Sequence, residues 1–150
     1  SKDKEFQRLV NIIMKPEERI VKARMKNSNN WIKGYYIYDS TNQKHFIYPL
    51  DNSAIKNELI EIDETTLCYF IGLKDKNKIP IYSNDIVIID NEPDYEYFIV
   101  EWNTDLARFV LNGDTYMVDF DNYNSTDCEV IGNKVGYPEY DFLNKHIWSI

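Results

Sequence analysis

This sequence has few of the residues that carry chemistry or cross-link a chain. Among 150 residues there are two cysteines, two histidines, five glycines and five prolines. Cys68 and Cys128 each lie in a strand-like segment, without a CxxC spacing and without clustered histidines. We therefore expect two buried free thiols rather than a disulfide or a metal site, and we expect no cofactor.

Membrane and catalytic signatures are also missing. No stretch approaches the roughly 20 apolar residues that a membrane-spanning helix needs, and the charged start of the chain lacks the pattern of a signal peptide. The sequence contains no GxSxG, HExxH, phosphate-binding loop or Rossmann glycine pattern. His45 lies on a predicted strand, far along the chain from His146, which favours a structural or surface role. These absences predict a cytoplasmic protein that is not an enzyme and does not bind membranes.

Acidic residues, in contrast, are abundant and unevenly distributed. Residues 1–84 hold 14 basic and 11 acidic side chains, whereas residues 85–129 hold 12 acidic side chains and one basic one, Arg108. Such an acidic region repels nucleic-acid phosphates and attracts basic partners. Ordinary solubility is the alternative explanation, because a strand with one wet face needs polar residues there. The cluster of Asp119, Asp121 and Glu129 lacks the order and the glycine of a calcium loop, so we expect no metal.

Twelve tyrosines and seven phenylalanines favour strands over helices. The central stretch, residues 69–90 (YFIGLKDKNKIPIYSNDIVIID), predicts a strand, a charged turn, a short strand, a second turn and a buried strand. Asn112-Gly113 predicts a two-residue hairpin turn of type I′. Gly34, within WIKGYYIY, predicts a bulge or a close backbone approach.

The strand pattern predicts a mainly β protein. The predicted strands are residues 20–25, 31–38, 44–48, 59–62, 66–71, 79–82, 86–89, 95–102, 108–111, 114–120 and 128–133. The short strands between residues 66 and 133 fit a small SH3-like barrel, and the earlier strands form a second small sheet. The expected parts are an N-terminal helical extension (1–19), a β-rich subdomain (20–65), an SH3-like β-barrel (66–142) and a C-terminal tail (143–150).

The N-terminal extension predicts a short amphipathic helix. Phe6, Leu9, Val10 and Ile13 recur at the spacing of one helical face. That apolar stripe must dock on a sheet of its own chain or on a second subunit. Because both ends of the chain carry apolar faces, we expect a homo-oligomer with this stripe at its interface.

Several motifs resemble the YopX family of phage and prophage proteins. The run GLKDKNKIPIYSNDIVIID resembles the family's "GLKDKNGKxIYEGDIV" signature. VKAR and NWIKGYYI resemble its opening strand and its "W-x-x-G-Y-Y" strand, while Glu101-Trp102 and CEVIGN resemble its "V-x-W" and closing strands. The likeness covers roughly residues 20–142, in order. It departs where Lys78 and Asn84 stand in place of glycine, so we expect those two turns to differ in type.

This resemblance implies an SH3-like barrel with a β-rich N-terminal part, encoded by a phage or prophage. It brings no established biochemical role and no catalytic residues. We therefore expect binding to an unidentified protein with a basic surface. One sharper form is a mimic of the charge of DNA that inhibits a host nucleic-acid-binding or defence protein. The candidate binding residues are Asp94, Tyr95, Glu96, Tyr97, Asp119 and Asp121.

Two alternatives remain at the level of sequence. The first is nucleic-acid binding by the basic N-terminal half, where aromatic side chains could stack on bases. The basic residues there are Lys22, Arg24, Lys26, Lys33 and Lys44. The aromatic residues that could stack on bases, or line a groove for a peptide, are Trp31, Tyr35, Tyr36, Tyr95, Tyr97 and Trp102. The second is a self-assembling structural protein. Packing in a core is the simpler explanation for most of the aromatic residues.

Overall fold

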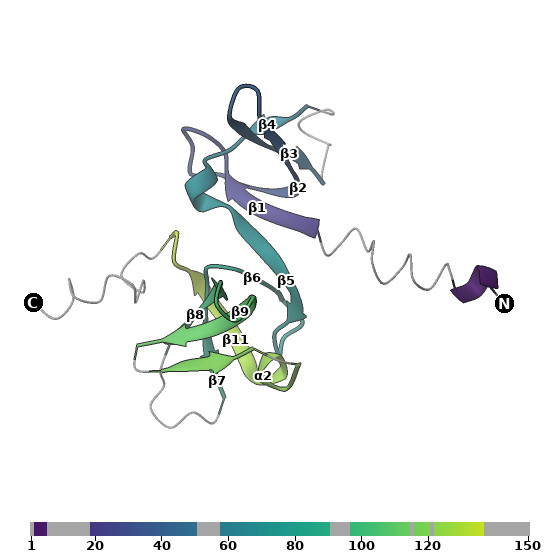
Figure 1. Ribbon diagram of the computed structural model, residues 1–150. Helices are drawn as coiled ribbons and strands as arrows, with labels where there is room; N and C mark the ends of the chain where they lie inside the picture. The colour runs from purple at the N-terminus through teal and green to yellow at the C-terminus, as the bar shows by residue number, and fades with distance from the viewer. Residues whose placement is uncertain are drawn as a thin grey trace, which may run out of the picture. The chain divides into compact units, whose positions relative to one another are not determined.

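A computed structural model describes residues 2–5, 19–50, 58–90, 97–114, 116–120 and 122–136 (Figure 1). The prediction of a mainly β protein is confirmed, because strands dominate these residues. The chain divides into two compact units, residues 1–69 and 70–150. Strand β5 (Cys68–Lys74) begins in the N-terminal unit and continues into the C-terminal unit.

The N-terminal unit is an antiparallel sheet with strand order β4-β3-β2-β1-β5. Its elements are β1 (Ile20–Arg24), β2 (Trp31–Asp39), β3 (Lys44–Pro49), β4 (Ile60–Glu61) and the 3-10 helix η2 (Glu64–Thr66). An isolated bridge pairs Met25, just after β1, with Ile62, just after β4. This bridge brings two non-neighbouring strands together at one end, so the sheet curls over its apolar face.

One face of this sheet forms the core of the unit. The buried residues are Val21, Ala23, Ile32, Ile47 and Ile62. Successive side chains of a strand point to opposite faces, so their neighbours along β1 and β2 lie on the other side of the sheet. The β2–β3 turn is held by the Asp39 carboxylate, which accepts hydrogen bonds from Thr41 N and Asn42 N.

Gly34 confirms the expected close backbone approach. Strands β2 and β3 pair Gly34 with Pro49. A Cβ atom on residue 34 would lie 1.9 Å from the carbonyl oxygen of Tyr48 and 2.7 Å from Cγ2 of Ile47. Only a residue without a side chain fits this position, which explains the glycine in the middle of a long strand.

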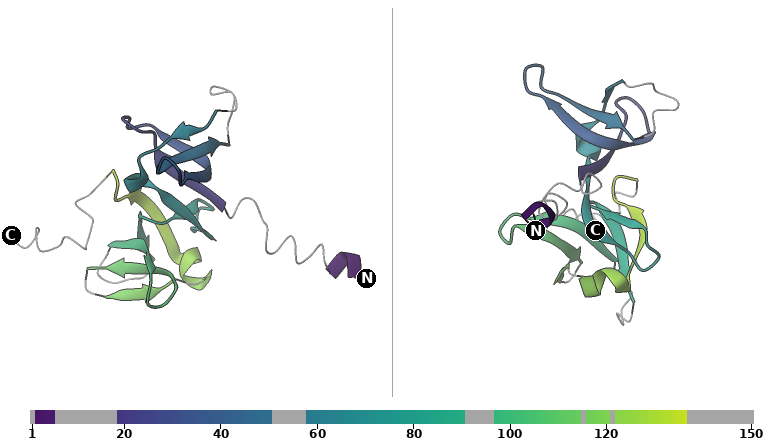
Figure 2. Two further views of the ribbon diagram at one scale, coloured as in Figure 1. Left: turned by 45° about the horizontal axis from the view of Figure 1, so that its top comes forward. Right: turned by 90° about the vertical axis from the view of Figure 1, so that its right-hand side faces the viewer.

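The C-terminal unit is built on a five-stranded antiparallel sheet with strand order β10-β9-β8-β7-β11 (Figures 1 and 2). The strands are β7 (Asp85–Ile89), β8 (Tyr97–Asn103), β9 (Arg108–Gly113), β10 (Met117–Asp119) and β11 (Cys128–Asn133). The short strand β6 (Pro80–Tyr82) pairs with β5, and the helix α2 (Asn122–Asp127) precedes β11. That helix was not expected from the sequence.

The core of this unit is apolar and buried. Ile81, Val87, Phe98, Val100, Leu111 and Cys128 pack together there. Ile99 points to the opposite face of β8 from Phe98 and is also completely buried. Both faces of β8 therefore carry buried bulk.

The type I′ turn predicted at Asn112-Gly113 is wrong. Asn112 pairs with Met117, and three residues, 114–116, connect β9 and β10. Neither Asn112 nor Gly113 has a positive φ, which a type I′ turn requires at both central residues. Instead, the Asn112 side chain donates a hydrogen bond from Nδ2 to Glu101 on the neighbouring strand, at 3.0 Å. A tertiary contact has thus overridden a strong local signal.

Some expectations lie outside the described residues. These are the apolar stripe of Phe6, Leu9, Val10 and Ile13, and the tail from residue 143 onward. Residues 2–5, just before the stripe, are helical. In the part of the C-terminal unit that is described, β10 and β11 are the edges of an open sheet, and no ladder joins them.

Candidate functional site

Asp75 is a buried acidic residue of the central stretch, residues 69–90, and its carboxylate organises the backbone around it. Its side chain is 5% exposed and lies in the turn between β5 and β6. One carboxylate oxygen accepts hydrogen bonds from the backbone N–H groups of Asn77 (2.8 Å) and Ile79 (2.9 Å). The other accepts from Val130 N at 3.0 Å, on β11. A single carboxylate therefore closes the turn and ties it to a strand 55 residues later.

Asp85 repeats the arrangement at the next turn. It is 1% exposed and accepts hydrogen bonds from Tyr82 N (2.8 Å) and from Nδ2 of Asn133 (2.9 Å). The first bond closes the β6–β7 turn, and the second reaches the end of β11. Buried carboxylates that accept several N–H bonds are positioned to organise backbone rather than to react.

Backbone hydrogen bonds add to the same junction. Lys76 N donates to the carbonyl of Cys128, and Lys134 N donates to the carbonyl of Asn84, both at 2.9 Å. The run GLKDKNKIPIYSNDIV and the run CEVIGN therefore hold each other in place. Two of the motifs that carry the family resemblance therefore form a structural junction of the C-terminal unit.

Lys78 and Asn84, which replace glycine in the two turns, both adopt a backbone conformation that glycine favours. Their φ angles are 64° and 71°, in the left-handed region that glycine enters freely. Asparagine tolerates this region better than most residues, whereas lysine is strained there. The replacements have not moved either backbone out of the conformation that a glycine would favour. They therefore give no reason for a different turn type.

The acidic groups of the C-terminal unit are partly compensated. Lys76 Nζ lies 3.0 Å from Asp90 and 3.5 Å from Glu129. Arg108 and Asp119 pair at 2.8 Å, and the Lys134–Glu101 pair measures 3.6 Å. Each basic side chain in these pairs cancels charge that a cationic partner would otherwise meet. The net charge is unchanged, but these pairs weaken the negative field that a partner would meet near Asp90, Glu101, Asp119 and Glu129.

The residues proposed for partner binding fall into two groups. Asp94, Tyr95, Glu96 and Asp121 lie outside the described residues, and only Tyr97 and Asp119 can be placed. Their registers are four residues apart along β8, because Asp119 aligns through β9 with Glu101. In addition, β9 separates their strands. The structure therefore does not bring these two side chains together.

The structure contains an exposed apolar turn, of which the sequence pattern had singled out only Trp102. Trp102 at the end of β8 is 54% exposed, and Leu106 in the β8–β9 turn is 42% exposed. The Trp102 ring packs edge-on against Phe109, with centroids 5.1 Å apart, so it is held in a defined orientation. Its one signal in the sequence is a tryptophan directly before a polar turn, and that tryptophan also belongs to a family motif.

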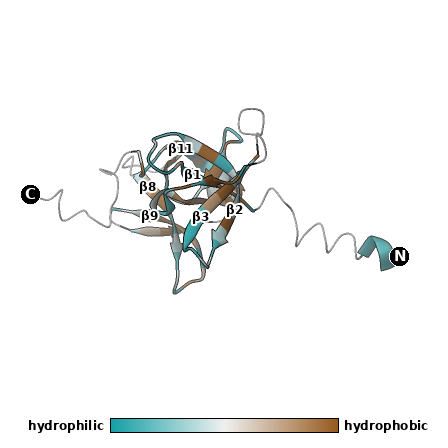
Figure 3. Ribbon diagram, turned by 90° about the horizontal axis from the view of Figure 1, so that it is seen from above, coloured by the Kyte–Doolittle hydropathy of each residue, from teal (hydrophilic) through white to brown (hydrophobic). Residues whose placement is uncertain are grey.

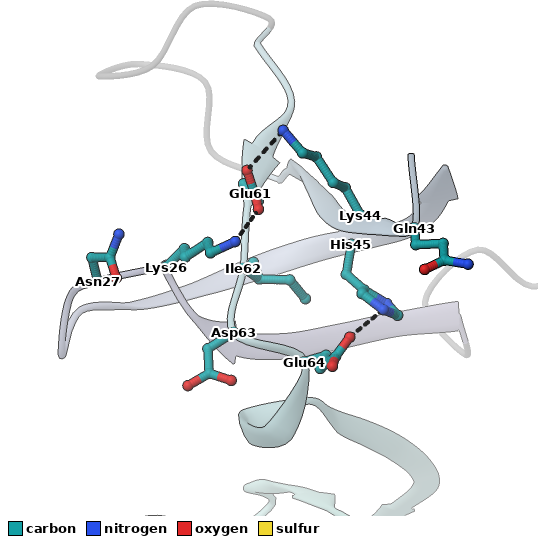
Figure 4. Close-up of a pocket in the computed structure, with 9 residues that line it drawn as sticks. All are labelled: Lys26, Asn27, Gln43, Lys44, His45, Glu61, Ile62, Asp63 and Glu64. Atoms are coloured by element: carbon teal, nitrogen blue, oxygen red, sulfur yellow. Dashed lines mark hydrogen bonds and ion pairs between the residues drawn. The ribbon is translucent and has the colours of Figure 1, made fainter. Parts of the chain in front are cut away.

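The N-terminal unit contains a polar pocket of about 290 Å³ (Figure 4). Glu61 lies between two lysines at one side, 2.7 Å from Lys26 Nζ and 4.0 Å from Lys44 Nζ. The hydrogen bond between Lys26 and Glu61 raises the pKa of the lysine and lowers the pKa of the carboxyl. Because Glu61 already occupies both ammonium groups, the pocket does not present them to an anion.

His45 contributes to the other side of this pocket. One ring nitrogen, Nδ1, is hydrogen-bonded to the hydroxyl of Tyr36, and the other, Nε2, pairs with Glu64. The imidazole also lies against the Tyr38 ring, with centroids 4.7 Å apart. Both nitrogens thus have partners within the unit. Burial raises the pKa of the Tyr36 hydroxyl above that of an ordinary phenol.

The two free buried thiols are confirmed. Cys68 and Cys128 are free and completely buried. Burial, helped by the nearby carboxylate of Asp127, raises the pKa of Cys128 to about 12. The thiolate is the reactive form of cysteine, so Cys128 is inert in the native protein.

We expect Cys128 to resist a thiol-specific reagent at pH 8 and to react once denaturant exposes it. Because its pKa is about 12, the native thiolate fraction stays negligible until strongly alkaline pH. The measurement is mass spectrometry of the protein after alkylation with iodoacetamide, with and without denaturant. Fast labelling of the native protein at residue 128 would contradict the assignment.

Metal-binding clusters and membrane-spanning helices are absent from the described ranges. Within them, no group of three or more histidine, cysteine or acidic side chains is arranged to hold a metal ion. None of the helices there combines the length and apolar character needed to cross a bilayer.

Comparison with known proteins finds a family whose matched region contains both motifs of the structural junction. The chain matches the family described as "YopX protein" over residues 20–139, which include both units and every strand from β1 to β11. No curated protein matches the chain significantly. The match covers most of the sequence and includes the two motifs that Asp75 and Asp85 tie together, so this chain belongs to the YopX family.

Proposed function

We propose that the chain is a phage or prophage accessory protein that acts by binding another protein and not by catalysis. The observation that carries the proposal is the exposed Trp102–Leu106 turn on an acidic unit. Tryptophan is enriched at the centres of protein interfaces. An oriented, half-exposed indole is an anchor of that kind.

The engagement of the polar groups supports the non-enzymatic part of the proposal. Asp75 and Asp85 hold backbone N–H groups, Cys128 is an inert thiol, and His45 lies between Tyr36 and Glu64. In this proposal the C-terminal unit is an SH3-like barrel, which is a common scaffold for binding sites and implies no particular chemistry.

The negative charge of the C-terminal unit indicates which kind of partner it would bind. The acidic stretch, residues 85–129, favours a partner with a basic surface, and a mimic of the charge of DNA is its sharper form. The ion pairs of Asp90, Glu129, Asp119 and Glu101 weigh against that sharper form, since they reduce the field of the described surface. Binding through the uncharged side chain of Trp102 does not depend on this charge mimicry.

The test is affinity capture from bacterial host lysate at low and high salt, with the bound proteins identified by mass spectrometry. We expect Trp102→Ala to lose a specific partner that the parent chain retains, because truncating an interface tryptophan costs about 2 kcal/mol or more. The matched control is Trp31→Ala, which removes an exposed tryptophan from the other unit. Equal capture by both variants and the parent would contradict binding through this turn.

Charge reversal tests the mimicry separately. If the partner is held by charge, its capture should fall steeply with salt and in a variant that combines Asp94→Lys, Glu96→Lys, Asp119→Lys and Asp121→Lys. Glu58→Lys reverses an exposed acid of the N-terminal unit and serves as the control. A partner retained at high salt would end the mimicry version and leave the Trp102 anchor in place.

A further inference from the structure

The N-terminal unit has a second sheet face that its core does not use. Val21, Ala23 and Ile32 point into the core, so the residues between them along β1 and β2 point outward. We call this outward side the aromatic–basic face. It contains Lys22, Arg24, Trp31, Lys33, Tyr35 and Tyr48.

Strand register places these residues in adjacent rows. Arg24 lies opposite Trp31, and Lys22 lies opposite Lys33. Tyr35 pairs with Tyr48 of β3, which makes a row of two phenol rings. Directly opposite side chains on one face are roughly 5 Å apart. Cations and rings therefore alternate over a continuous surface of three strands.

Trp31 is an aromatic residue of this face that contacts two of its cationic side chains. Its ring is 38% exposed and lies 5.4 Å from Lys22 Nζ and 5.5 Å from the guanidinium carbon of Arg24. Both cations lie over the ring as cation–π partners, so a base would stack on the part of the ring that they leave open while the cations lie near its phosphates. The ribbons of β2 and β3 carry both apolar and polar positions, as Figure 3 shows.

Charge complementarity indicates which class of ligand fits the aromatic–basic face. Strands β1, β2 and β3 contain one acidic side chain, Asp39 at the end of β2, whose carboxylate accepts hydrogen bonds from the β2–β3 turn, whereas residues 85–129 hold 12 acidic side chains. An anionic polymer therefore fits this face and not the acidic stretch. Among anionic polymers, single-stranded nucleic acid fits best, because its unpaired bases offer flat surfaces to Trp31, Tyr35 and Tyr48. A duplex would hide them in its stack.

We propose that the aromatic–basic face of the N-terminal unit binds single-stranded nucleic acid, with Trp31 stacking on a base and Lys22, Arg24 and Lys33 contacting phosphates. This activity is separate from the proposed protein binding, which uses the other unit. Experiments can therefore disprove either the nucleic-acid binding or the protein binding without affecting the other. Recognition by stacking and charge is tolerant of sequence, so a preference for single strands is expected before any preference for bases.

The experiment is fluorescence anisotropy of labelled oligothymidine and oligouridine, each about 15 nucleotides long to span one site, with the full chain at low salt. Trp31→Ala should weaken binding about tenfold or more, and Trp31→Phe should retain most of it, because phenylalanine still offers a ring face. Lys33→Glu should weaken binding and flatten the salt dependence. With two or three phosphate contacts, the parent chain should lose affinity by about tenfold between roughly 50 and 200 mM salt.

Matched controls come from the C-terminal unit. Trp102→Ala and Lys74→Glu change an exposed tryptophan and an exposed lysine there, and both should bind nearly as tightly as the parent chain. Circular dichroism establishes that the Trp31 and Lys33 variants are folded. No binding at micromolar protein, equal affinity for a duplex of the same length, or equal losses in the control variants would each overturn the proposal. Binding of a polyglutamate peptide that is lost in Trp31→Ala, without oligonucleotide binding, would overturn it in favour of an acidic protein partner.

Discussion

Asp75→Ala is expected to lower the free energy of unfolding of the C-terminal unit by about 3–5 kcal/mol. Three backbone N–H groups would lose a charged acceptor, those of Asn77, Ile79 and Val130. Hydrogen bonds to charged groups contribute about 1.5–3 kcal/mol each, and water can replace part of that where the turn is open. A small domain is stable by only about 5–15 kcal/mol, so this one substitution should approach global unfolding.

The measurement is urea denaturation combined with hydrogen exchange of the backbone amides. The amide of Val130 should lose protection first, since it is bound directly by the carboxylate. Asp105→Ala is the control, because Asp105 is exposed in the β8–β9 turn and should change stability by less than about 0.5 kcal/mol. Asp75→Asn should fall between the two, because an amide keeps one acceptor oxygen. Equal stability of the Asp75 and Asp105 variants would refute the structural role of the junction.

Gly34→Ala is expected to destabilise the N-terminal unit by about 3 kcal/mol or more. The added Cβ would lie 1.9 Å from the carbonyl oxygen of Tyr48, a distance that no side-chain rotation can relieve, because both atoms belong to or adjoin the backbone. Strands β2 and β3 must separate locally, and the Gly34–Pro49 pairing is lost. Overpacking that forces backbone shifts costs about 1–3 kcal/mol even without such a loss.

Hydrogen exchange of the backbone amides shows which strands the Gly34→Ala substitution destabilises. Amides of β2 and β3 should lose protection in Gly34→Ala, while amides of β7 and β8 should not, because they belong to the other unit. Gly72→Ala is an informative comparison. A Cβ atom on residue 72 would meet nothing within 4 Å, but its φ of +89° leaves a conformational strain of about 1–2 kcal/mol. A smaller loss of stability for Gly34→Ala than for Gly72→Ala would contradict the steric clash as the cause.

The order and placement of strands could be predicted from residue pattern. The run WIKGYYIY became β2, KHFIY became β3, and CEVIGN became β11, with ends that differ by a residue or two at most. In each run, β-branched and aromatic residues are bounded by turn-forming ones, and both signals are local. The close approach at Gly34 was predicted for the same reason, since a glycine inside a strand often marks a bulge or the near approach of another backbone.

Local patterns failed where a distant contact decided the outcome. Asn112-Gly113 is a strong hairpin signal, yet Asn112 remains in a strand because its side chain binds Glu101 across the sheet. Asp119 and Tyr97 share the acidic, tyrosine-rich stretch, which suggested a common site. Their registers place them four residues and two strands apart. Counting acids also could not show that Asp85 is buried and that Asp90, Glu101, Asp119 and Glu129 are paired.

The sequence by itself determined that this is a mainly β member of the YopX family with two free buried thiols and an acidic C-terminal half. These properties depend on composition, alternation and short motifs, which are all readable along the chain. Only the tertiary structure decided the roles of Asp75 and Asp85, because their partners Val130 and Asn133 lie about 50 residues away and meet them through strand pairing. It likewise decided that two cations, Lys22 and Arg24, lie over the Trp31 ring, since that neighbourhood exists only once β1 and β2 are in register.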